Sequence, residues 1–179
     1  MKPMKTSKLS ALALVGALVL LVTALAPAAE AAGLKAQVFL VQATVPRTLT
    51  EKALLGFAKK NNNKLLREET SEEVKKRKWS AQMIIAFNKP VDDLEFQVLF
   101  YDVHDGPRRF VNDMATFVND KKQKTFVQKI TLPRPSFKPN RNMELVVTVR
   151  RQEVGRREFG LVGEEIKRSG TVDFSDAER

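Results

Sequence analysis

Apolar and polar side chains alternate along most of the second half of the chain. In WSAQMIIAF (79–87) every second residue is apolar, from Trp79 to Phe87, and LEFQVLFYDV (94–103) repeats the pattern. A period of two is typical of a strand with one buried face. Similar patterns predict further strands at residues 35–45, 109–118, 124–132, 143–151, 154–163 and 171–174.

The pattern changes to a helical one at residues 49–61. Thr48 and Glu51 have the spacing of a capping box at the start of a helix, and the three asparagines at 61–63 can end the helix. The apolar face consists of Leu54, Leu55, Phe57 and Ala58. Gly56 costs a helix roughly 1 kcal/mol relative to alanine. We therefore expect this short helix to depend on docking against a sheet.

The segment between this helix and Trp79 is ambiguous. KLLREETSEEVKKRK allows a short strand, a polar turn near Thr70 and a basic approach to the next strand. With seven or more short strands and one helix, the chain is predicted to be mainly β, an antiparallel β-sandwich with one helix inserted after the first strand.

One turn resembles a known class of modules. In FKPNRNMELVVTV (137–149) a proline-asparagine turn leads into an alternating strand, which is similar to the corner before the penultimate strand of immunoglobulin-like and fibronectin type III-like modules. The resemblance covers about residues 79–163. A tyrosine often stands in that family where this chain has Met143, and the family's disulfide is absent. The resemblance implies a sandwich with a binding role.

Residues 1–31 have the pattern of a secretory signal peptide. A basic start precedes the apolar run ALALVGALVLLVTALA, and small residues follow. Cleavage is expected after Ala31, or alternatively after Ala28. An uncleaved membrane anchor is the other interpretation, since the run approaches the roughly 20 residues that span a bilayer. After cleavage, residues 32–179 form one domain without a transmembrane span.

The amino-acid composition indicates the cellular compartment of the protein and the charge of its partners. The chain has no cysteine, which fits a bacterial periplasm or secretion from a bacterium. The net charge is +10, and +8 remains without residues 1–31. This excess favours a polyanionic partner such as lipopolysaccharide or an anionic polymer. Genomic DNA is excluded as a partner by the signal peptide.

The stretch YDVHDGPRRF (101–110) holds the only tyrosine and the only histidine. If it is a hairpin turning at Asp-Gly, residues opposite each other sum to 211. The predicted pairs are Val103 with Arg108, Asp102 with Arg109, Tyr101 with Phe110, and Phe100 with Val111. These pairs are stabilising across strands, so the sequence predicts a structural hairpin.

A metal site is the alternative for this stretch. Zinc would require several ligands from histidine, cysteine or carboxylates, and the chain has one histidine and no cysteine. Calcium prefers oxygen ligands, which could come from Asp92, Asp93, Asp102, Asp105 and Asp113. No D-x-D-x-D loop is present, and two arginines compete for the carboxylates. We predict no metal and no cofactor.

Catalytic motifs are equally scarce. The phosphate-binding loops, G-x-S-x-G and S-x-x-K are missing, and cysteine catalysis is impossible. A serine triad would have to use His104 with Ser80, Ser136 or Ser169. Paired carboxylates for hydrolysis stay possible, because their spacing is spatial. We predict a protein without catalytic residues.

Basic clusters are the remaining candidates for a binding site. The candidate polyanion-binding residues are Lys75, Lys76, Arg77, Lys78, Arg108 and Arg109. If KKRK extends an edge strand, its side chains alternate between two faces, and its lysines serve only to prevent aggregation. In RPSFKPNR (134–141), arginines surround an aromatic residue, and we expect Phe137 to be a buried plug.

Three functions follow as hypotheses. The leading one is a periplasmic or secreted, non-enzymatic binding or accessory protein of the bacterial envelope that acts through protein–protein contacts, by strand addition or by charge. The second is a module that binds lipopolysaccharide or another anionic polymer. The third, from a different class, is a hydrolase that uses buried carboxylates.

Overall fold

The computed structural model describes residues 33–46, 48–70 and 72–165. The chain divides into Met1–Gly33 and Leu34–Arg179, and the second unit contains both β-sheets. The predicted signal peptide, residues 1–31, and the predicted strand at 171–174 lie outside the described residues. Within the described residues, no helix has the length and apolar character needed to cross a membrane.

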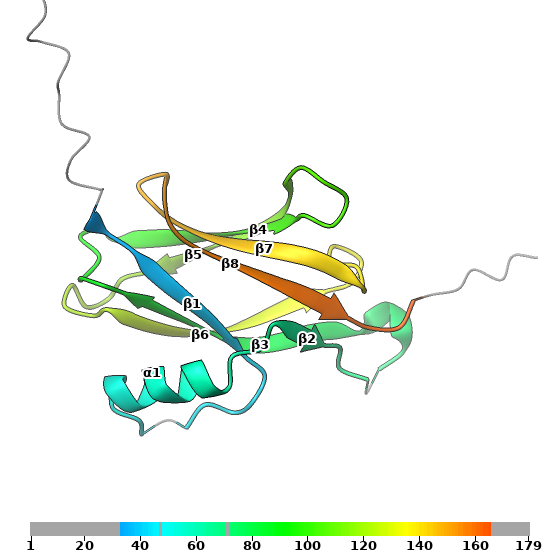
Figure 1. The fold of residues 1–179 in the computed structure, drawn as a ribbon, viewed down its shortest axis with the longest axis horizontal. Helices are drawn as coiled ribbons and strands as arrows, with labels where there is room; N and C mark the ends of the chain where they lie inside the picture. The colour runs from blue at the N-terminus through cyan, green and yellow to red at the C-terminus, as the bar shows by residue number, and fades with distance from the viewer. Residues whose placement is uncertain (1–32, 47, 71, 166–179) are drawn as a thin grey trace, which may run out of the picture. The chain divides into compact units, whose positions relative to one another are not determined.

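Two β-sheets pack face to face as a sandwich, which confirms the predicted fold class (Figure 1). The first sheet is antiparallel and consists, in spatial order, of β1 (Ala36–Val41), β3 (Lys78–Phe87) and β6 (Thr125–Pro133). The second consists of β2 (Leu65–Arg67), β8 (Gln152–Val162), β7 (Arg141–Val149), β4 (Glu95–Asp102) and β5 (Arg109–Phe117). Its neighbours are antiparallel except β2, which runs parallel to β8.

The order of the strands agrees with the resemblance found in the sequence. With β1, β3 and β6 as strands A, B and E, and β4, β7 and β8 as C, F and G, each strand lies in the sheet where immunoglobulin-like sandwiches have it. Met143, at the position where that family often has a tyrosine, is buried in the core.

The core lies between the sheets and is built from the alternating faces that the sequence predicts. On β3, the buried core residues are Trp79, Ala81, Met83, Ile85 and Phe87. Phe87, Phe96 and Phe126 meet edge to face with ring centroids 5.0–5.8 Å apart. Edge-to-face contacts of this kind stabilise aromatic clusters beyond their buried area.

The helix α1 (Glu51–Lys60) docks on the outer face of the three-stranded sheet, as its marginal composition requires (Figure 1). Ala58 packs there against Phe39 and Ile84. The predicted capping residue is wrong. Thr50 rather than Thr48 has the extended backbone of an N-cap, and its hydroxyl accepts a hydrogen bond from the amide of Ala53 at 3.4 Å.

The two sides of the sandwich differ. On one side β1 lies so close to β8 that a Cβ on Gly155 would be 2.4 Å from the carbonyl oxygen of Ala36. On the other side β5 and β6 are edge strands of their sheets. They are linked by a 2.7 Å hydrogen bond from the Thr116 hydroxyl to the side-chain oxygen of Gln128. β5 and β6 are thus sheet edges, as β1 and β2 are at the other ends of the two sheets.

Candidate functional site

The stretch at 101–110 is a hairpin between β4 and β5, with two of the four predicted pairs. Asp102 faces Arg109 and Tyr101 faces Phe110. Phe100, however, faces Asn112 and not Val111, because a bulge between Phe100 and Tyr101 shifts the register by one residue.

The fourth predicted pair is absent as well. Val103 and Arg108 lie outside the ladder, in the connection between the two strands.

The carboxylates of this region are held by arginines. The buried side chain of Asp102 accepts hydrogen bonds from Arg109 at 2.9 Å and from the backbone amide of His104 at 3.0 Å. Asp105 pairs with Arg141. Among the described residues there is no group of three or more histidine, cysteine or acidic side chains that could hold a metal ion.

Two aromatic rings and an arginine form an exposed cluster on the outer face of the five-stranded sheet. Phe110 is 56% exposed and meets Tyr101 edge to face, with centroids 6.0 Å apart. The guanidinium of Arg108 lies 5.7 Å from the centroid of Tyr101. Arg108 is fixed by ion pairs with Glu144 at 2.5 Å and Glu153 at 3.5 Å. The hydrogen bond to Glu144 raises the pKa of Arg108 above its ordinary value. We call Tyr101, Arg108 and Phe110 the aromatic cluster.

The predicted basic run KKRK does not extend an edge strand. Lys75 and Lys76 lie in a 3₁₀ helix, η2 (Val74–Lys76), and Lys78 opens β3, which runs between β1 and β6. The expected alternation of these side chains on an edge is therefore wrong, because the chain bends before it enters the centre of the sheet.

Five of the six candidate polyanion-binding residues have acidic partners. Their ion pairs are Lys76–Glu73 at 3.6 Å, Arg77–Glu164 at 2.8 Å, Lys78–Glu69 at 3.9 Å, Arg108–Glu144 at 2.5 Å and Arg109–Asp102 at 2.9 Å. Lys75 forms no ion pair within the described part of the chain. Of the six, Arg77 lines a smaller hollow, and Lys75 alone lines a larger, open pocket.

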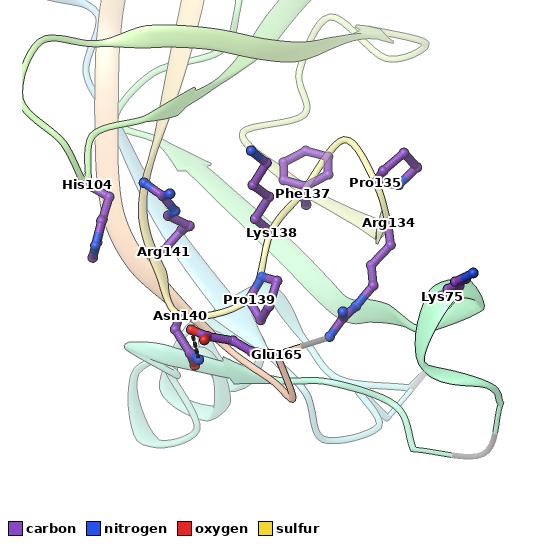
Figure 2. Close-up of a pocket in the computed structure, with 10 residues that line it drawn as sticks. All are labelled: Lys75, His104, Arg134, Pro135, Phe137, Lys138, Pro139, Asn140, Arg141 and Glu165. Carbon is purple, nitrogen blue, oxygen red and sulfur yellow. Dashed lines mark hydrogen bonds between the residues drawn. The ribbon is translucent and has the colours of Figure 1, made fainter. Parts of the chain in front are cut away.

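This pocket, with a volume of about 920 Å³, lies where the 134–141 loop joins β6 to β7 (Figure 2). Its lining residues are Lys75, His104, Arg134, Pro135, Phe137, Lys138, Pro139, Asn140, Arg141 and Glu165. Four of them are lysine or arginine, and Glu165 is the one carboxylate on this wall. We call it the basic pocket.

Buried contacts fix the walls of the basic pocket. Phe137 is 1% exposed and meets Phe100 edge to face, so the predicted plug is confirmed. Arg134 pairs with Glu68 at 2.5 Å and lies 5.5 Å from the ring centroid of Trp79. In Figure 2 the Arg134 side chain runs toward Glu165, whose carboxylate accepts a hydrogen bond from Asn140.

The hairpin supplies another wall of the basic pocket. His104 lies on it, and Arg141 is held beside it by Asp105. This hydrogen bond from Arg141 lowers the pKa of Asp105 and raises that of Arg141. Both groups therefore stay charged at neutral pH.

Sequence reasoning did not assign Arg134, Lys138 or Arg141 to a site. The signal in the sequence is the arginine and lysine content of RPSFKPNR, a stretch that also fits a structural corner. The corner exists, and its cations line a pocket only because the distant Lys75 and His104 complete the wall.

The comparisons with known proteins do not assign a family. No protein-family model matches the chain, and neither does any curated protein. Among solved structures, the chain is similar to a β-glucosidase from Kluyveromyces marxianus in complex with glucose, at 10% sequence identity and a TM-score of 0.33. The match covers 55% of this chain and 14% of the other, and a likeness of this degree has no bearing on function.

Proposed function

We propose that this protein is a non-enzymatic binding or accessory protein of the bacterial envelope, periplasmic or secreted, and that it binds a protein partner at the aromatic cluster. The observation that supports this proposal is the exposed ring of Phe110, held against Tyr101 beside a fixed Arg108. The location rests on the signal-peptide pattern of residues 1–31.

The composition of the cluster is that of a protein interface. Aromatic residues and arginine are enriched in the cores of interfaces and among the residues that dominate their affinity. Arg108 is already held by Glu144 and Glu153, and Phe110 rests on Tyr101. Little conformational entropy is therefore lost when a partner covers them.

The position of the cluster on β5 defines the form of the partner. β5 is an edge strand, so an extended segment of another protein can pair with its main chain at the end that carries Phe110, short of Phe117. Phe110, near the start of this strand, then provides an aromatic contact for the added segment.

In-cell photo-crosslinking tests this proposal. A photoreactive phenylalanine analogue is placed at position 110, and separately at Phe117, which is 68% exposed at the other end of the same strand. We expect a discrete protein adduct from position 110 and none from position 117.

The identified partner is then purified and its affinity measured. Phe110→Ser should weaken binding by tenfold or more, as expected for a residue that dominates an interface, and Phe117→Ser by less than about twofold. No adduct from position 110, or equal losses from the two variants, would contradict the proposal.

The geometry gives the hydrolase hypothesis little support. A second hollow, of about 710 Å³, contains Glu68 and Glu164. Arg77 lies 2.8 Å from Glu164 and 4.0 Å from Glu68, and Glu68 is bound by Arg134 as well. Both carboxylates are therefore engaged in ion pairs with arginines.

A further inference from the structure

We propose that the basic pocket binds phosphate groups carried by a polymer or a glycolipid. This site differs from the protein-binding cluster in its residues and in the chemistry of its ligand. Its failure would leave the proposed protein partner unaffected, because the aromatic cluster lies on the outer face of the five-stranded sheet and shares no residue with the pocket lining.

The first argument is the charge that remains after internal pairing. Arg134 and Arg141 are paired with Glu68 and Asp105, and Glu165 is bound by Asn140. Lys75 and Lys138 are exposed and form no ion pair among the described residues. The wall thus carries two lysines without an ion pair and one carboxylate, Glu165, whose hydrogen bond from the neutral Asn140 amide leaves its negative charge in place.

The second argument is that the wall is fixed before a ligand arrives. Phe137 and the ion pair of Arg134 with Glu68 anchor the 134–141 loop. Asp105 anchors Arg141. A site with fixed walls loses little entropy on binding, and only the two lysine side chains need to be ordered.

The third argument concerns the ligand. A phosphate group carries negative charge and acceptor oxygens, which suit a lysine that has no ion pair. Figure 2 shows Lys75 and Lys138 on different sides of the pocket, so separate phosphates of one polymer or headgroup would contact them. Lysine is a frequent phosphate ligand that acts as a point charge. The pocket is open to solvent, so phosphates on a soluble polymer or on the headgroup of lipopolysaccharide can reach it.

The test compares two double variants with the same change in net charge. Lys75→Gln/Lys138→Gln removes the two unpaired cations of the pocket. Lys89→Gln/Lys121→Gln removes two exposed lysines in turns at the opposite end of the three-stranded sheet, where Ala86 pairs with Thr125. Binding to linear polyphosphate, lipopolysaccharide micelles and polygalacturonate is measured across a salt series, and thermal melts confirm that all proteins fold.

We expect binding to a phosphate-bearing probe that weakens with salt, as for contacts that release counterions. The pocket variant should bind about tenfold or more weakly, as for the loss of charged hydrogen bonds, and the control variant less than about threefold. Binding of both phosphate probes, or of either one, supports the site and identifies the source of the phosphate.

Three results would overturn the inference. The first is no binding of either phosphate probe at low salt. The second is an equal loss in the two double variants, which would attribute binding to net charge alone. The third is polygalacturonate binding as tightly as the phosphate probes, which would remove the assigned preference. Glu165→Gln should have the opposite effect on affinity. It removes the carboxylate from the wall and should therefore tighten phosphate binding.

Discussion

Arg134 and Glu68 form an ion pair that is almost completely removed from solvent, with 6% and 3% of their side chains exposed. Arg134 also lies over the ring of the buried Trp79. The pair joins the loop after β6 to the segment after β2, which is 66 residues away in the sequence. It therefore fixes one wall of the basic pocket to the core.

Glu68→Gln should destabilise the protein, because it leaves the guanidinium of Arg134 buried without its carboxylate. Removing one partner of a buried pair costs about 3–5 kcal/mol. We expect the free energy of unfolding in urea to fall by about 3 kcal/mol. Glu69→Gln is the matched control. Its pair with Lys78 is about 40% exposed on both sides and should contribute less than about 1 kcal/mol. Similar losses in the two variants would contradict this account.

Phe137→Ala should open a cavity beneath the 134–141 loop. Truncating a buried phenylalanine costs about 3–5 kcal/mol, and Phe137 is 1% exposed against Phe100. Phe117→Ala, at an exposed position on β5, should change stability by less than about 1 kcal/mol. Denaturant unfolding of both variants checks the difference. A loss below about 1 kcal/mol for Phe137→Ala would mean that the plug does not support the loop.

The sequence predicted the strands well because burial of one face imposes a period of two. The expected strand at 79–87 is observed at Lys78–Phe87, and the strand at 94–103 at Glu95–Asp102. Two of the four predicted hairpin pairs, Asp102 with Arg109 and Tyr101 with Phe110, followed from turn chemistry and from the complementarity of their side chains. These are local signals, so a single sequence contains them.

Other features depend on geometry that the sequence does not express. The bulge between Phe100 and Tyr101 shifts the register within an otherwise regular strand. Thr48 and Thr50 are both plausible caps, and only the path of the chain selects Thr50. The basic pocket combines the 134–141 loop with residues from three other segments of the chain, so no local sequence pattern predicts it.

Gly155→Ala and Gly56→Ala should have opposite effects. The new Cβ at position 155 would meet the backbone oxygen of Ala36 at 2.4 Å, so β1 or β8 must shift. We expect a loss of about 1–3 kcal/mol, as for overpacking. At Gly56, in α1, no atom lies within 4 Å of the new Cβ, and the helix gains roughly 1 kcal/mol. Thermal melts of both variants show whether each substitution raises or lowers the stability of the protein. Stabilisation by Gly155→Ala would show that the contact of β1 with β8 is looser than described.

Asp105 should titrate below the ordinary range of an aspartate, because the hydrogen bond from Arg141 stabilises its carboxylate. A lowered pKa in the folded state makes this group stabilising above its unfolded-state pKa. That contribution is lost as the pH falls through the lower, folded value. Carbon-detected NMR of the side-chain carboxyl gives the midpoint directly. In Arg141→Gln the midpoint should rise toward its ordinary value, whereas Arg150→Gln, which removes the partner of Asp93, should leave it unchanged. An unchanged midpoint in Arg141→Gln would show that Arg141 does not hold the hairpin against the basic pocket in solution.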